Sequence, residues 1–426
     1  MPYTHELCDF IKKSPVSYYT VNTVKEYLLQ AGYTEVYESE PQSFADGKKH
    51  FVIRGDSSII AFRGRTEQGG FMICASHSDS PTFKIKNELA GGSYLRVATE
   101  KYGGMIHYTW LDRPLSVAGR VVVKTADGAR VKLVNIEKPM LVIPSVAIHL
   151  NRGVNDGYKF NPASDLIPLA GLADAKGGLM QAVASAADAK VEDIISHDLF
   201  LYNADEGVCL GVNGELVLAP RLDDLGCVYS SLRAFLDAPE TDKSVAVLAV
   251  FDNEEVGSET KQGANSTFLD NTLKNIAGSP EKYSAMLYHS FMVSADNAHA
   301  LHPNHPELSD SSNAPVLGKG VVVKYNANQR YTTDALSDGI FTVIAGRAGA
   351  KLQRFSNRAD MVGGSTLGSI SNTRVSVPTI DIGLPQLAMH SANETAAAGD
   401  LDDMVKALTQ LYSSGIIKTG DEIKIV

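Results

Sequence analysis

The sequence has little cysteine. Four cysteines occur in 426 residues, at positions 8, 74, 209 and 227, and no two of them form a CxxC pair. Any metal site must therefore use histidine, aspartate and glutamate rather than thiolate ligands. Scattered thiols without such pairs are typical of a reducing compartment, so we expect a cytoplasmic protein.

The sequence also lacks an excess of positive charge and a long apolar run. Its net charge is −10, which disfavours binding to nucleic acid or to an anionic membrane surface, because both need a basic face. No stretch approaches the ~20 apolar residues that cross a bilayer. The first residues lack the basic region and apolar core of a signal peptide. We expect neither nucleic acid nor a membrane as a partner.

Hydrophobic residues make up 44% of the chain, enough for a large core. Residues 1–90 and 219–426 alternate between apolar runs and amphipathic helical patterns, whereas residues 91–218 are dominated by hairpin signals. One such signal is the turn at 126–129 between two strand-like segments. These patterns predict an α/β fold, in which a mixed-sheet domain formed by residues 1–90 and 219–426 is interrupted by an inserted β-rich domain.

An acidic pair, Glu254 and Glu255, follows the apolar run at 245–251. The run is typical of a buried parallel strand, and open α/β sheets bind ligands at the carboxyl ends of such strands. Two adjacent carboxylates repel each other unless a cation or a shared proton relieves them. The pair indicates either a metal site or a solvated acidic loop, and by itself it does not decide between them.

Other candidate ligands follow further apolar runs. His77 comes directly after the strand predicted at 71–76, with Asp79 two residues later, and a metal-bound imidazole needs such a carboxylate to hold its other nitrogen. Asp296 follows a strand predicted at 285–294, and His390 follows a late strand-like run. Each has an ordinary alternative as a surface, core or loop residue.

Asp223 opens an amphipathic helix, where an aspartate is usually only a cap, but Asp223 and Asp224 precede an apolar face without basic partners, which leaves room for a ligand role. The chain thus offers five nitrogen and oxygen ligands, namely His77, Asp223, Glu255, Asp296 and His390. If Asp223 bridges, this set suits two divalent ions, with zinc, manganese or cobalt as the candidates. Glu254 would then stay free as a general base.

The ordered motifs closely resemble the aspartyl aminopeptidase family of dinuclear metallopeptidases over nearly the whole chain. They read Ala-Ser-His77-Ser-Asp79, Arg-Leu-Asp223-Asp, Asn-Glu254-Glu255-Val-Gly, Ser-Ala-Asp296-Asn-Ala-His and Ala-Met-His390-Ser. The resemblance implies a metallopeptidase domain with an inserted dimerisation domain at residues 91–218. It also implies peptide substrates and self-association into dimers and a tetrahedral dodecamer.

The resemblance implies a role for each matching residue. His77 and Asp296 would hold one metal ion, and Glu255 and His390 the other, with Asp223 bridging the two. Glu254 would be the general base, and Asp79 would orient His77.

Two further residues take roles from the same resemblance. His149 would reach the active site of a neighbouring subunit and help to bind the substrate carbonyl. Lys324 would be the basic group near the pocket for the substrate side chain.

The sequence departs from the family pattern at two places. Ser391-Ala-Asn-Glu394 replaces the usual arrangement with Arg-Glu, and Asp224 stands where asparagine is common. These changes leave the expected ligands intact but affect the charge near the pocket. We therefore expect an exo-aminopeptidase that prefers acidic N-terminal residues, with neutral or broad specificity as the alternative. A metal-stabilised scaffold or receptor without peptidase activity is the non-enzymatic alternative.

Overall fold

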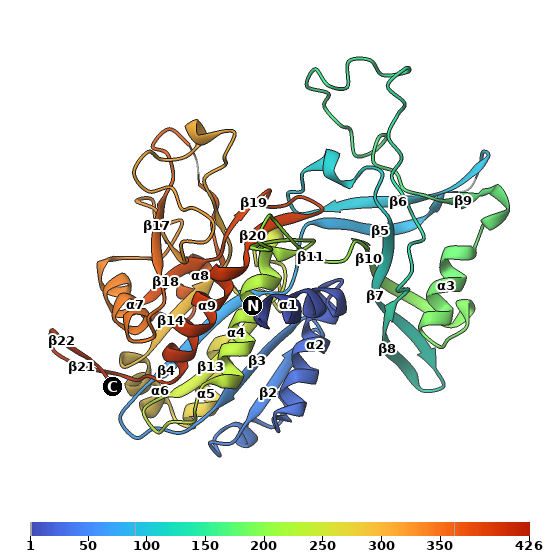
Figure 1. Cartoon of the computed structure of the whole chain (residues 1–426). Helices are drawn as coiled ribbons and strands as arrows, with labels where there is room; N and C mark the ends of the chain where they lie inside the picture. Colours follow the sequence, from blue (N-terminus) through green and yellow to red (C-terminus); the bar gives the residue numbers. More distant parts are fainter. Residues whose placement is uncertain (1, 90, 362) are drawn as a thin grey trace.

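The computed structural model describes residues 2–89, 91–361 and 363–426 (Figure 1). Its largest element is a nine-stranded sheet with the order β1-β2-β3-β13-β4-β14-β18-β16-β17. In chain order these strands are β1 (Thr34–Glu35), β2 (His50–Arg54), β3 (Ser58–Arg63), β4 (Phe71–His77), β13 (Val245–Phe251), β14 (Phe291–Ala295), β16 (Val321–Tyr325), β17 (Leu352–Ser356) and β18 (Thr379–Gly383). The four central strands, β13, β4, β14 and β18, run parallel, whereas β3 and β16 pair with them antiparallel.

Helices cover both faces of this sheet (Figure 1). Alternate side chains of β13 enter different cores: Leu248 packs with residues of one helix set, and Val247 packs with residues of the other. The first set is α1 (Pro2–Lys13), α2 (Ser17–Gln30), α4 (Leu222–Asp237), α7 (Ala335–Arg347) and α9 (Ala398–Tyr412), and the second is α5 (Phe268–Ala277), α6 (Pro280–Tyr288) and α8 (Leu367–Asn372). The predicted α/β fold with a mixed sheet is confirmed.

A second sheet has six strands in the order β8-β7-β10-β5-β6-β9, and every pairing in it is antiparallel. Its elements are β5 (Thr82–Leu89), β6 (Tyr94–Tyr102), β7 (Leu115–Thr125), β8 (Gly128–Asn135), β9 (Leu169–Leu172) and β10 (Ile194–Asn203), with α3 (Gly178–Ala186) alongside. This sheet extends to one side of the nine-stranded sheet (Figure 1) and has a separate core around Trp110 and Leu199. The hairpin predicted at 126–129 is present as β7 and β8. Strand β5 lies before residue 90 yet belongs to this sheet.

A third sheet joins distant parts of the chain, with the order β11-β12-β20-β19-β15. Its strands are β11 (Val208–Leu210), β12 (Leu216–Ala219), β15 (Ala298–His299), β19 (Pro385–Leu387) and β20 (Glu394–Ala397). The register pairs Ala219 with Glu394, so the start of α4 lies next to the segment before β20. A hairpin of β21 (Ile416–Thr419) and β22 (Glu422–Ile425) follows α9.

Six short 3₁₀ helices complete the described elements: η1 (Pro41–Phe44), η2 (His107–Trp110), η3 (Ala173–Ala175), η4 (Val191–Asp193), η5 (Glu254–Val256) and η6 (Pro306–Leu308). The strand predicted at 285–294 was wrong in its first half, because α6 continues to Tyr288 and the strand begins only at Phe291. A short apolar run does not by itself distinguish a buried helix from a buried strand. Among the residues described, no helix has the length and apolar character needed to cross a membrane.

Candidate metal centre

Three neighbouring parallel strands bring candidate ligands to one edge of the large sheet. His77 is the last residue of β4, Asp296 directly follows β14, and Glu255 lies in η5 after β13. These strands are adjacent in the order β13-β4-β14, so their carboxyl ends meet. The positions predicted from the apolar runs therefore come together in space, as expected for a binding site at the carboxyl edge of an α/β sheet.

Asp223 and His390 reach the same place by another route. Asp223 lies at the start of α4 in a non-helical conformation, with φ −85° and ψ 107°, and the Asp223–Asp224 peptide bond is cis. His390 lies between β19 and β20. The pairing of β12 with β20 places these two segments side by side. All five ligands predicted from the sequence thus belong to one cluster.

Asp223 lies between the two histidines. Its Oδ1 is 3.5 Å from Nε2 of His77, and its Oδ2 is 3.6 Å from Nε2 of His390. On the first side, Asp296 Oδ1 is 4.0 Å from His77 Nε2, and on the second side Glu255 Oε1 is 3.3 Å from His390 Nε2. Ligands at about 2.0 Å from a tetrahedral zinc ion lie roughly 3.3 Å apart, so both groups are close to the size that such an ion needs.

The hydrogen bonding of the donor atoms also suits metal binding. Asp223 Oδ1 and Glu255 Oε1 are buried and have no hydrogen-bond partner among the described residues. The other ring nitrogen of each histidine is held by a backbone carbonyl: His77 Nδ1 lies 3.1 Å from the Asp79 oxygen, and His390 Nδ1 lies 3.0 Å from the Gly104 oxygen. This leaves both Nε2 atoms facing carboxylates, which is the arrangement of metal-ligating histidines. The residues fit a pair of divalent ions.

The pKa values of the charged groups in the cluster also favour the binding of cations. Burial raises the pKa of Glu255 to about 7, and the Asp223 carboxylate adds to the effect. Burial also raises the pKa of Glu254 well above its ordinary value, with Asp296 and Glu255 as further causes. Burial alone would lower the pKa of His390, but the Asp223 and Glu255 carboxylates raise it to about 12. Glu254 and Glu255 thus lack enough positive charge around them, and divalent cations would supply it.

Asp79 holds the backbone of the acidic pair, Glu254 and Glu255, in addition to lying beside His77. Its Oδ1 accepts a hydrogen bond from the Glu254 N–H at 3.1 Å, and its Oδ2 accepts one from the Glu255 N–H at 3.2 Å. The Tyr102 hydroxyl donates to the same Oδ2 at 2.7 Å. Asp79 also lies near His77, with its Oδ1 3.4 Å from Nδ1. The Glu254 carboxylate lies beside the candidate ligands, within 4.8 Å of donor atoms of His77 and Glu255, where a general base would be needed.

The structure brings Lys324 to the cluster but not His149. Lys324 is 2% exposed in β16, and its ammonium donates to the backbone oxygens of Asp296 at 2.7 Å and Asn297 at 3.1 Å. It also lies 3.6 Å from Asp296 Oδ2. His149 is exposed in the segment between Ile143 and β9, and it belongs to none of the candidate ligand groups found in the described parts of the chain.

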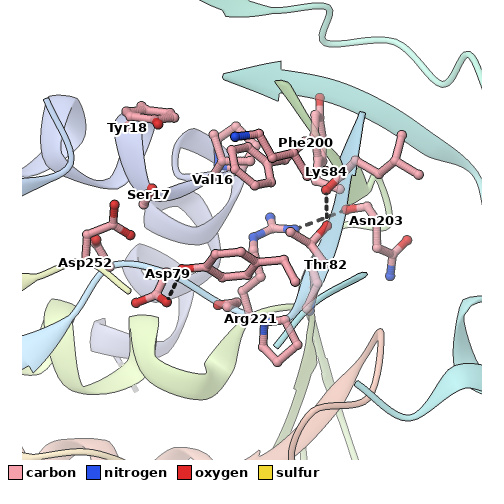
Figure 2. Close-up of a pocket in the computed structure, with 18 of the residues that line it drawn as sticks. Val16, Ser17, Tyr18, Asp79, Thr82, Lys84, Phe200, Asn203, Arg221 and Asp252 are labelled. Carbon is pink, nitrogen blue, oxygen red and sulfur yellow. Dashed lines mark hydrogen bonds between the residues drawn. The ribbon is translucent and has the colours of Figure 1, made fainter. Parts of the chain in front are cut away.

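Two carboxylates near the cluster were expected from the sequence only to affect the charge near the pocket. Asp224 Oδ2 accepts the His77 N–H at 3.2 Å, and Glu394 bonds to two backbone N–H groups of the cluster. A carboxylate that accepts from the backbone of a distant segment leaves no motif, so neither role was visible in the sequence. Glu394 also lines a cavity of about 240 Å³, with Asp79, Arg221 and Asp252 on its wall (Figure 2).

Comparisons with known proteins identify the family. A family model described as aminopeptidase I zinc metalloprotease (M18) matches residues 10–412. A probable M18 family aminopeptidase 2 of Clostridium novyi is 42% identical over 96% of this chain and 98% of its own length. A protein of the same name from Ectopseudomonas mendocina is 36% identical over 96% of this chain and 97% of its own length.

Solved structures agree with the sequence relatives. A chain from the cryo-EM structure of the Ape4 and Nbr1 complex superposes with a TM-score of 0.93 at 34% identity, covering 96% of this chain and 85% of that chain. The S. cerevisiae mApe1 dodecamer gives a TM-score of 0.84 at 27% identity and covers 96% of each chain.

The fold and the buried donor cluster define a metal-dependent peptide hydrolase. The chain belongs to the M18 family of zinc metallo-aminopeptidases. The predicted family, enzyme class and zinc dependence are confirmed, and the non-enzymatic scaffold is set aside.

Proposed function

We propose that this aminopeptidase removes acidic residues, Asp or Glu, from the N-termini of peptides by means of a two-metal site. The observation that carries the two-metal part is Asp223, whose two oxygens lie 3.5 Å and 3.6 Å from different histidines. In the proposed assignment His77 and Asp296 hold one ion, Glu255 and His390 hold the other, and Asp223 belongs to both. Two zinc ions, when bound, supply Lewis-acid activation of the scissile carbonyl and of water.

Glu254 is the proposed general base. It would take a proton from the attacking water and pass it to the leaving amine, and a buried carboxyl with a raised pKa suits that exchange near neutral pH. The hydrogen bonds from its own N–H and from that of Glu255 to Asp79 hold the pair in place. The Tyr102 hydroxyl in turn holds Asp79 by a hydrogen bond. These bonds therefore fix the backbone position from which the Glu254 side chain extends.

Lys324 supports the acidic preference because it is a buried cation beside the cluster. An acidic substrate side chain would compete with Asp296 for its ammonium, and a site built for a charged partner rejects analogues that lack the charge. The existing bonds of Lys324 to Asp296 and Asn297 support the alternative, in which the lysine only steadies a ligand and specificity is neutral or broad.

A substrate panel separates these two specificities. The zinc-loaded enzyme is assayed with aminoacyl anilides of Asp, Glu, Asn, Gln, Leu and Ala. The acidic assignment predicts that kcat/KM for Asp exceeds that for Asn, its nearly isosteric neutral analogue, by at least about tenfold, since a lost charged hydrogen bond costs about 1.5–3 kcal/mol. A preference for Leu or Ala would reject it.

We also propose that the chain self-associates into dimers and, through them, a tetrahedral dodecamer. The exposed segment around His149 carries apolar side chains, with Leu150 84% and Val146 58% exposed, and such a patch marks an interaction surface. The mApe1 relative was solved as a dodecamer. In this proposal residues 91–218 form the inserted domain, residues 1–90 and 219–426 form the catalytic domain, and His149 serves a neighbouring subunit. Light scattering of the active protein tests it, because a fully active monomer would exclude a role across subunits.

The cytoplasm is the proposed location. Cys8, Cys74, Cys209 and Cys227 are all free thiols, which supports a reducing compartment.

A further inference from the structure

One carboxylate connects two of the proposed metal ligands. Glu394 begins β20 and is 2% exposed. Its Oε2 accepts a hydrogen bond from the Asp223 N–H at 2.9 Å, and its Oε1 accepts one from the His390 N–H at 2.6 Å. Both donors are backbone groups, so the carboxylate fixes the main chain of the ligands rather than their side chains.

Both backbone positions need such an acceptor. Asp223 has φ −85° and ψ 107°, which lies outside the helical region although α4 has begun. His390 has φ +67°, a left-handed conformation that costs a non-glycine residue energy and persists only where the surroundings hold it. A buried N–H without an acceptor is costly, and Glu394 supplies the acceptor at both places.

The two proposed metal positions are held in different ways. On the first side, His77 belongs to β4 and Asp296 directly follows β14, so the ladder of the large sheet fixes their backbones. On the second side, His390 lies in an irregular segment between β19 and β20. Its ring is held by Gly104 and its backbone by Glu394. The second position therefore depends on Glu394 more than the first.

We propose that Glu394 is a positioning residue that sets the geometry of the second metal position, between Glu255 and His390. By holding Asp223 and His390 through a single rigid group, it fixes the 3.6 Å separation of Asp223 Oδ2 from His390 Nε2. This inference rests on the ligand roles proposed above. It assigns Glu394 no contact with substrate.

The variant Glu394→Gln tests the inference. An amide of nearly the same volume has a single acceptor oxygen, so one of the two hydrogen bonds is lost. Zinc is titrated into the metal-free full-length chain against a competing chromophoric chelator. One of the two zinc dissociation constants should rise at least tenfold, the usual effect of removing a supporting partner of a metal ligand, and the other, which depends on Glu394 only through the shared Asp223, should rise by less.

Asp400→Asn is the matched control. Asp400 is 1% exposed, and its two oxygens accept the N–H groups of Gly318 at 2.7 Å and Gly320 at 2.6 Å. The control breaks the same type of paired hydrogen bond at the start of α9, so it should leave both zinc constants unchanged. Thermal unfolding of both variants measures the purely structural cost.

Three outcomes would count against these assignments. Glu394→Gln with both zinc constants within threefold of wild type would overturn the positioning role. An equal weakening of both sites would also overturn it, because a general loss of stability acts on both. A wild-type chain that binds only one zinc ion would instead overturn the two-metal assignment on which the inference rests. If Glu394→Gln does not fold, Glu394→Asp is titrated by the same criteria, since its side chain keeps the charge but is one methylene too short to reach both donors.

Discussion

The replacement of Glu254 by Gln removes the proposed general base with little change of shape. Positioned general bases contribute about 10²–10⁴-fold to a rate, so kcat should fall by that factor, which corresponds to about 3–5 kcal/mol of activation free energy. The two zinc ions should remain bound, because the five proposed ligands are untouched. Loss of rate with full metal content is the pattern that identifies a base rather than a ligand.

The same variant should cost the metal-free protein little stability. The Glu254 carboxylate lies within 4.8 Å of a Glu255 oxygen, and two like charges at that distance repel by about 3–4 kcal/mol at an effective dielectric constant of 20. An attraction to His77 of similar size offsets this repulsion, while Asp296 adds to it. The net effect of these charges on Glu254 is repulsive, so removing the charge should not lower the free energy of unfolding of the metal-free chain.

The assay measures kcat on an aspartyl anilide together with zinc content, and calorimetry gives the unfolding temperature of the metal-free chain. Alanine at position 254 serves as a control for the loss of side-chain volume. A Glu254→Gln variant that keeps activity within threefold of wild type at equal zinc content would refute the assignment of the base. A variant that loses a zinc ion together with its activity would show that Glu254 is a ligand.

Four further outcomes are expected. Removal of zinc by a chelator should lower the unfolding temperature. Zinc at a free concentration a thousand times its dissociation constant adds about 4 kcal/mol to the stability of the fold. An unchanged unfolding temperature would mean that the ions do not stabilise the fold. His149→Ala and Glu254→Gln subunits are each inactive alone, and mixing them at random into dimers should recover about a quarter of wild-type activity. Half of the dimers are then heterodimers, and half of the sites in each heterodimer have both residues intact. No recovery would exclude action across subunits. Lys324→Met should reduce kcat/KM for Asp substrates by more than for Leu substrates, whereas an equal reduction would indicate that the lysine only supports Asp296. Leu248→Ala in β13, where the side chain is 0% exposed, should destabilise the fold by about 2–5 kcal/mol in chemical denaturation, and a loss below about 1 kcal/mol would mean that the core repacks around the cavity.

Local patterns predicted the parts of the site that depend on single strands. The apolar run at 245–251 is β13 with the same bounds, and the run at 71–76 is β4, which continues to His77. The prediction failed where an apolar run spans two elements, as at 285–294, which contains the end of α6 and the start of β14. Apolar content reports burial, and a buried helix end and a buried strand are equally apolar over so few residues.

The sequence by itself determined which residues can bind metal and where most of them lie along the strands, because donor chemistry is a property of each side chain and the ends of apolar runs fix strand ends. It also determined the family, through the order of five short motifs. Only the tertiary structure decided that the two oxygens of Asp223 face different histidines and that Lys324 is bonded to the backbone of Asp296. It also decided that Glu394 accepts hydrogen bonds from the backbones of both Asp223 and His390. These relations depend on strand pairing between segments far apart in the chain, such as β12 with β20, and no local pattern encodes which distant strands pair.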